Sequence, residues 1–126
     1  MTNLLPLEIW QEILEYTNFI DQIHLRMVCR DMYFLKIYDF YNIPYKYKYR
    51  LNDDIIKLHP YIKYLDASNN KQITSVNHCT QLQKLDASYY CGISDDGFIH
   101  CTQLTVLNAT YNNKITRKIK KIEISL

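Results

Sequence analysis

The strongest constraint on the fold of this chain is a short phrase that occurs three times after its midpoint. Ile62-Lys-Tyr-Leu65-Asp-Ala-Ser68 returns at residues 82–88 and again, with Asn and Thr in place of Asp and Ser, at residues 104–110. The repeat length is 20 residues and then 22. Periods of this size indicate stacked supersecondary units that share one continuous core.

Apolar and polar residues alternate around the second leucine of each unit. Leu65 and Ala67, like their counterparts in the other units, lie on one side of a strand whose side chains alternate with period two. An isoleucine eight residues after each second leucine returns the chain over the far side of the core. Because every unit contributes one strand in the same direction, we expect a parallel sheet in a curved solenoid.

The segment in front of the repeats, residues 43–50, alternates aromatic and basic side chains. One interpretation is a nucleic-acid site, in which rings stack on bases beside cations that bind phosphates. The other is an extended strand with one apolar and one charged face. Residues 51–56 align with residues 93–98, which favours a degenerate first repeat with its strand near residues 43–47 and Pro44 on an edge. A net charge of +2 also argues against a nucleic-acid partner.

The first forty residues predict three short amphipathic helices. The first runs from Leu5 to Tyr16 and places Pro6 at the first helical position, where its missing N–H costs nothing. The second begins near Asp21, and the third runs from about Asp31 to Tyr41. Helices this short bury little surface by themselves and must pack against a neighbour or a partner.

The helical segment carries an ordered motif, LPxEIxxxIL followed by Asp21 and then LRxVCR. Its order and spacing over residues 3–42 resemble an F-box, the module by which substrate receptors dock on the Skp adaptor of cullin–RING ubiquitin ligases. One departure is Met32, where family members usually carry Trp. The resemblance implies that the apolar side chains face the Skp adaptor instead of an internal core. The residues expected to contact it are Leu5, Pro6, Leu7, Ile9, Trp10, Ile13, Leu14, Leu25, Val28, Cys29 and Arg30.

The repeats resemble leucine-rich repeats of the cysteine-containing kind. Residues 94–98 (SDDGF) and 101–104 (CTQL) match that pattern best, whereas Ala occupies the third inward site and Asn, Tyr and Asn occupy the turn site. The resemblance implies a concave sheet face that binds a target protein, with Asp66 and Asp86 side by side and Lys84 near enough to offset them. The expected target-binding residues are Tyr64, Asp66, Ser68, Lys84, Asp86, Tyr89, Val106, Asn108 and Tyr111.

Together these features predict an α+β fold in two parts. Residues 1–42 form a small three-helix F-box-like module. Residues 43–126 form a short leucine-rich-repeat solenoid with a parallel β-sheet and about four units, of which the first and last are degenerate.

The sequence lacks the motifs of the common enzyme and metal-site classes. It contains no HExxH, GxSxG or glycine-rich phosphate loop, and its four cysteines show no CxxC spacing. The cysteines of the repeats and the turn asparagines are therefore interpreted as structural residues that are buried or bonded to the backbone. We expect no cofactor and no metal. No basic leader and no apolar run of about 18 residues occurs, which predicts a cytoplasmic or nuclear protein without a membrane partner.

The resulting functional hypothesis is a non-catalytic substrate receptor of a Skp–cullin–F-box ubiquitin ligase. Its F-box would bind the Skp-type adaptor of a cullin–RING ligase, and its repeats would hold an unknown protein substrate for ubiquitin transfer by positioning alone. An alternative is a repeat scaffold outside any ligase, whose helices only cap the solenoid. A third possibility is a chain that occupies the adaptor without recruiting a target.

Overall fold

A computed structural model describes residues 11–12, 18, 21–22, 36–116 and 123–125. The chain divides into two compact units, Met1–Ile37 and Tyr38–Leu126. In the first unit, Gln11–Glu12 and Asp21–Gln22 are helical, as predicted for these positions. Asn18 accepts a hydrogen bond from the backbone N–H of Asp21 at 2.9 Å, which is the interaction of a helix N-cap.

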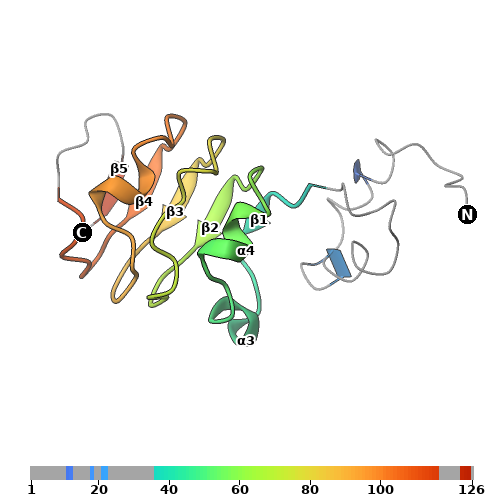
Figure 1. Ribbon diagram of the computed structural model, residues 1–126, viewed down its shortest axis with the longest axis horizontal. Helices are drawn as coiled ribbons and strands as arrows, with labels where there is room; N and C mark the ends of the chain where they lie inside the picture. Colours follow the sequence, from blue (N-terminus) through green and yellow to red (C-terminus); the bar gives the residue numbers. More distant parts are fainter. Residues whose placement is uncertain (1–10, 13–17, 19–20, 23–35, 117–122, 126) are drawn as a thin grey trace, which may run out of the picture. The chain divides into compact units, whose positions relative to one another are not determined.

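The second unit is built on a five-stranded parallel sheet whose strands follow the order of the sequence (Figure 1). Leu65, Leu85 and Leu107 are aligned in neighbouring strands, so the three copies of the repeated phrase pair in register. This confirms the predicted parallel sheet. The strands are β1 (Asp39–Phe40), β2 (Tyr64–Asp66), β3 (Lys84–Asp86), β4 (Val106–Asn108) and β5 (Glu123–Ser125).

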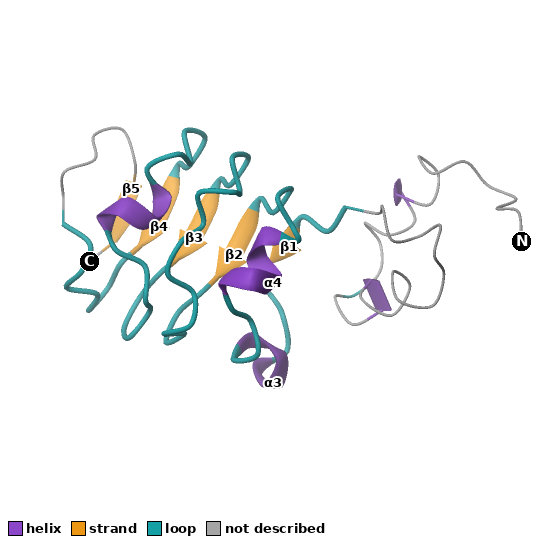
Figure 2. Cartoon of the chain, viewed as in Figure 1, coloured by secondary structure: helices purple, strands orange, loops and turns teal. Residues whose placement is uncertain are grey.

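Helical structure in the second unit is short and lies between the strands (Figure 2). The α-helices are α3 (Tyr45–Lys48) and α4 (Asp53–Lys57), and η2 (Asp95–Phe98) is a 3-10 helix. Asn52 caps α4, since its side-chain oxygen accepts a hydrogen bond from the Ile55 N–H at 2.9 Å. Most of each repeat beyond its strand is therefore turn and loop.

The core follows the repeat pattern. The inward leucines and alanines of the strands and the isoleucines that follow them are buried, and Val76 and Phe98 close the core on the return path, as predicted. The three cysteines of the repeats are also buried and free, which agrees with a structural role. These residues are Leu65, Leu85, Leu107, Ala67, Ala87, Ala109, Ile73, Ile93, Ile115, Cys79, Cys91 and Cys101.

Two predictions about the junction were wrong. The segment expected to be the first strand forms α3 instead, with Pro44 at its N-cap and not on a sheet edge. The first strand is β1, in which Phe40 pairs with Leu65 and is buried. The third predicted helix consequently does not reach Tyr41, because residues 36–38 are not helical and β1 follows them. Burial of Phe40 opposite Leu65 thus decides where the sheet begins, and local alternation at residues 43–47 does not.

Candidate functional site

The candidate site predicted for target binding lies on the outward side of β2, β3 and β4. The strand register places Lys84 between Tyr64 and Val106 in one row. A second row aligns Asp66, Asp86 and Asn108, which confirms that the two carboxylates stand side by side.

Each residue of the second row accepts hydrogen bonds from the residue two positions later in its own repeat. The Oδ1 atom of Asp66 accepts hydrogen bonds from the N–H and the hydroxyl of Ser68 at 2.9 and 2.7 Å. Asp86 receives the same pair from Ser88, and Asn108 receives it from Thr110. Ser68 is only 8% exposed. Its hydroxyl therefore serves the turn at the end of its strand and offers little surface to a target.

The cation that balances Asp66 comes from α3. The Nζ atom of Lys48 lies 3.1 Å from the Oδ2 atom of Asp66 and also hydrogen-bonds the Ser68 hydroxyl. Lys84, which was predicted to offset the carboxylates, instead lies over the ring of Tyr41 at 4.2 Å from its centroid. Within the described residues Lys84 forms no ion pair with either carboxylate. The ion pair of Lys48 was not predicted because a strand was expected near residues 43–47, where α3 forms instead. Within the described residues, Asp86 forms no ion pair.

Tyr41 is a neighbour of the carboxylates that the sequence did not indicate. Burial raises the pKa of its hydroxyl, and the negative charges of Asp86 and Asp66 raise this pKa further. The phenol is therefore held in its neutral form beside the two carboxylates. Its position depends on β1 ending at Phe40, which the hydrophobic pattern did not predict.

Two of the predicted residues lie in backbone conformations that side chains usually avoid. Asn69, Tyr89 and Tyr111 occupy equivalent turns with φ of 58°, 60° and 58°. Asn tolerates this left-handed region, whereas the backbone of a Tyr in it is strained. The Tyr89 and Tyr111 rings pack against each other with centroids 5.5 Å apart, and they remain 47% and 80% exposed. Strained, exposed aromatic residues of this kind are typical of functional surfaces.

The comparison with protein-family models decides the identity of the amino-terminal segment. Residues 3–36 match the F-box domain. No curated protein and no solved structure matches the chain significantly.

An F-box domain implies the role of a substrate adaptor in a Skp–cullin–F-box ubiquitin ligase, and F-box proteins are typically its non-catalytic subunits. All eleven residues predicted to contact the Skp adaptor fall within the matched range but outside the described residues. The match does not extend to the repeats that follow the F-box, so their leucine-rich-repeat identity and the target contacts stay predictions.

The thiols of the described residues are buried. Burial raises the pKa of the Cys79 thiol to about 12, and those of Cys91 and Cys101 to about 11, so these thiols stay protonated and unreactive near neutral pH. The described residues contain no group of three or more potential metal ligands. Among the same residues, no helix is long and apolar enough to cross a membrane.

Proposed function

We propose that this protein is a substrate receptor whose F-box binds a Skp-type adaptor and whose repeats hold a target protein for ubiquitin transfer. The observation that carries the proposal is the F-box match at residues 3–36, followed in the same chain by a parallel sheet built from in-register repeats. A repeated parallel sheet offers an extended, rigid binding surface, and a receptor needs no more than that to position a target.

On this proposal the repeats have the architecture of leucine-rich repeats. Support comes from the strand in each unit, the buried leucine, alanine and isoleucine positions, and the buried cysteines of residues 79 and 101. The contacts to the Skp adaptor are the eleven apolar and basic residues of the F-box motif named above. The target contacts include the exposed aromatic side chains Tyr64, Tyr89 and Tyr111.

The test is co-expression of the full chain with a Skp-type adaptor, followed by purification of the complex. The variant Leu5→Ala/Pro6→Ala removes two side chains of the motif, and Glu12→Ala changes an exposed side chain in the same segment. We expect a stoichiometric complex with the wild type and with Glu12→Ala, and its loss in the double variant.

Circular dichroism of each variant separates lost binding from lost folding. A double variant that is folded and no longer binds the adaptor supports the proposal. A folded wild-type chain that does not bind the adaptor contradicts it, and then leaves the repeat scaffold, capped by its helices, as the function of the chain.

A further inference from the structure

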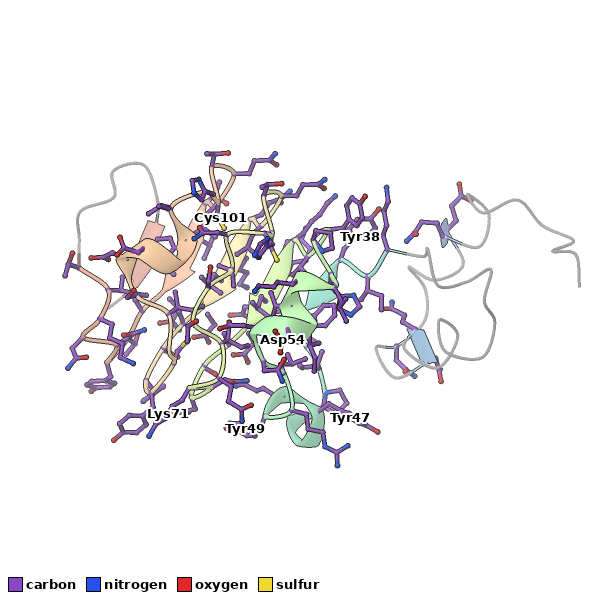
Figure 3. The ribbon with its side chains drawn as sticks, viewed as in Figure 1. Tyr38, Tyr47, Tyr49, Asp54, Lys71 and Cys101 are labelled. Carbon is purple, nitrogen blue, oxygen red and sulfur yellow. The ribbon has the colours of Figure 1, made fainter. Side chains whose placement is uncertain are left out.

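One edge of the sheet, where β2, β3 and β4 end, gathers cations and exposed tyrosines. Because the strands are parallel and in register, the segments that follow their carboxyl ends lie along the same edge. The segment containing α3 joins this edge, since the Asn70 side chain donates hydrogen bonds to the carbonyls of Lys48 and Leu51, both at 3.0 Å. Figure 3 shows Tyr47, Tyr49 and Lys71 along this side of the sheet, with Tyr38 and Cys101 on the opposite side.

The four segments that form this edge contain cations and no carboxylate, and Asp66 and Asp86 lie directly before two of them. Residues 45–52, 67–72, 87–92 and 109–114 contain no Asp or Glu. They contribute the exposed cations and the exposed aromatic rings that we name the basic–aromatic edge: Arg50, Lys71, Lys114, Tyr89, Tyr90 and Tyr111. Lys48 lies in the same segments but is paired with Asp66, so it is not counted.

Two carboxylates outside these segments are hydrogen-bonded to threonines. Asp53 accepts hydrogen bonds from the N–H and hydroxyl of Thr74 at 2.8 and 2.5 Å. Asp95 does the same for Thr116 at 2.8 and 2.6 Å. Lys71 and Lys114 form no ion pair within the described residues. The edge therefore presents cations without an ion-pair partner, beside aromatic surface.

We propose that the basic–aromatic edge binds an acidic, extended segment of a protein rich in Asp and Glu. Charge complementarity selects such a partner, because carboxylates can pair with the ammonium and guanidinium groups that the edge leaves unpaired. Tyrosine hydroxyls and rings add hydrogen bonds and contact area at low entropic cost. The strained backbones of Tyr89 and Tyr111 hold two of these rings outward on the edge.

The ring contacts disfavour single-stranded nucleic acid, the other polyanion that basic and aromatic residues can bind. Base stacking needs open ring faces. Lys71 lies over the ring of Tyr90 at 5.5 Å, and Arg50 lies over that of Tyr47 at 5.8 Å. Tyr89 and Tyr111 pack on each other. These contacts cover part of each ring face and leave less of it for stacking on bases. The cations over the rings can still pair with anions.

The cations of the edge lie outside the carboxylate row on the sheet, whereas Tyr89 and Tyr111 were already predicted as target contacts. On the proposed function the acidic segment belongs to the target protein. The inference rests on the proposed function only in assigning the acidic segment to the target protein. Binding of an acidic segment by this edge does not require the Skp adaptor, which the F-box is proposed to bind.

Fluorescence anisotropy of the full chain with a fluorescein-labelled (Glu-Gly)6 peptide tests the inference. The peptide (Lys-Gly)6 controls for charge sign, and the oligonucleotide dT12 tests the nucleic-acid alternative. The variant Lys71→Gln/Lys114→Gln removes two cations of the edge. Lys57→Gln/Lys63→Gln removes two at the end of α4 and ahead of β2, where they do not belong to the edge.

We expect (Glu-Gly)6 to bind more tightly than either other probe, and its binding to weaken as salt is raised. The edge variant should lose about fivefold or more in affinity, and the control variant less than about twofold. Absence of peptide binding, equal losses in both variants, or tighter binding of dT12 would each overturn the inference. Retained binding to the Skp adaptor in the same preparation shows that the proposed function has not failed with it.

Discussion

The Nζ atom of Lys48 lies 3.1 Å from the Oδ2 atom of Asp66, and this ion pair joins α3 to the outward side of the sheet. The two side chains are only 12% and 20% exposed, so solvent screens their attraction less than it would on an open surface. The same ammonium contacts the Ser68 hydroxyl, which is itself bonded to Asp66. The ion pair therefore belongs to a network that fixes the first connection of the second unit.

Replacement of Lys48 by Met should destabilise the protein by about 1–2 kcal/mol, since it leaves the half-buried Asp66 without its cation. The measurement is the midpoint of urea unfolding, with an unchanged m-value. Lys57→Met, at the exposed end of α4, is the matched control and should shift the midpoint little. The ion pair would be excluded as the cause if Lys48→Met cost as much in an Asp66→Asn background as in the wild type.

The sheet could be predicted from the sequence because its signals recur. Leu65 and Leu85 occupy the same position in the repeated phrase, so the inward and outward positions assigned in one unit apply to the others. The same equivalence predicts which residues pair between neighbouring strands. The F-box was predictable for a similar reason: its motif consists of several residue types in a fixed order, and the family match covers residues 3–36 of the predicted 3–42.

The junction could not be predicted because its evidence was local and occurred once. Alternating Tyr and Lys over residues 45–48 is compatible with a strand and equally with one helical turn. The contacts that favour the helix join residues far apart in the sequence. Phe40 pairs with Leu65, and the Asn70 side chain donates hydrogen bonds to the carbonyls of Lys48 and Leu51 near the end of α3. The basic–aromatic edge was missed for the same reason, since it requires α3 to lie beside the turns that follow the strands.

The turn asparagines provide the second prediction, because two of the three units share a buried Asn and the middle unit does not. The Asn112 side chain donates to the carbonyls of Ala87 at 2.7 Å and Ile93 at 3.1 Å, and accepts from the Lys114 N–H at 3.0 Å. The equivalent residue in the middle unit, Tyr90, is 72% exposed.

Asn112→Ala should destabilise the protein by about 2–3 kcal/mol, since it leaves buried backbone groups without partners. Asn113→Ala changes the same residue type at the adjacent exposed position and should have an effect within about 0.5 kcal/mol. Both values come from chemical denaturation. Equal effects of the two substitutions would show that the hydrogen bonds of Asn112 do not stabilise the stack of repeats.

In the middle unit, the backbone at Gly92 lies close to the backbone of the preceding unit. A Cβ atom on Gly92 would lie 2.6 Å from the Lys71 carbonyl oxygen and 2.8 Å from that of Ile73. Only glycine permits so close an approach of two backbones. The Gly92 N–H also donates to the Asn70 carbonyl at 3.1 Å, which joins the middle unit to the one before it. Sequence comparison of the repeats alone gave no sign of this close approach.

The third prediction concerns alkaline pH and follows from the buried thiol of Cys79. Its pKa rises from 9.0 to about 12, chiefly because burial disfavours the thiolate and secondarily because Cys101 lies nearby. The folded protein therefore keeps a proton that the unfolded chain releases above about pH 9. The stabilising contribution of this group is complete below that pH and is lost progressively as the pH rises toward about 12.

The free energy of unfolding of the wild type should thus fall more between pH 8.5 and 10.5 than that of Cys79→Ala, by about 2 kcal/mol. Groups shared by both proteins, including the tyrosines and the other thiols, cancel in this difference. Thr80→Ala, an exposed neighbour that leaves the thiol intact, should follow the wild type. If the free energy of unfolding of Cys79→Ala fell as much as that of the wild type over this range, the prediction would be contradicted. The Cys79 thiol would then have the same pKa in the folded and unfolded states, and its burial would not affect the pH dependence of stability.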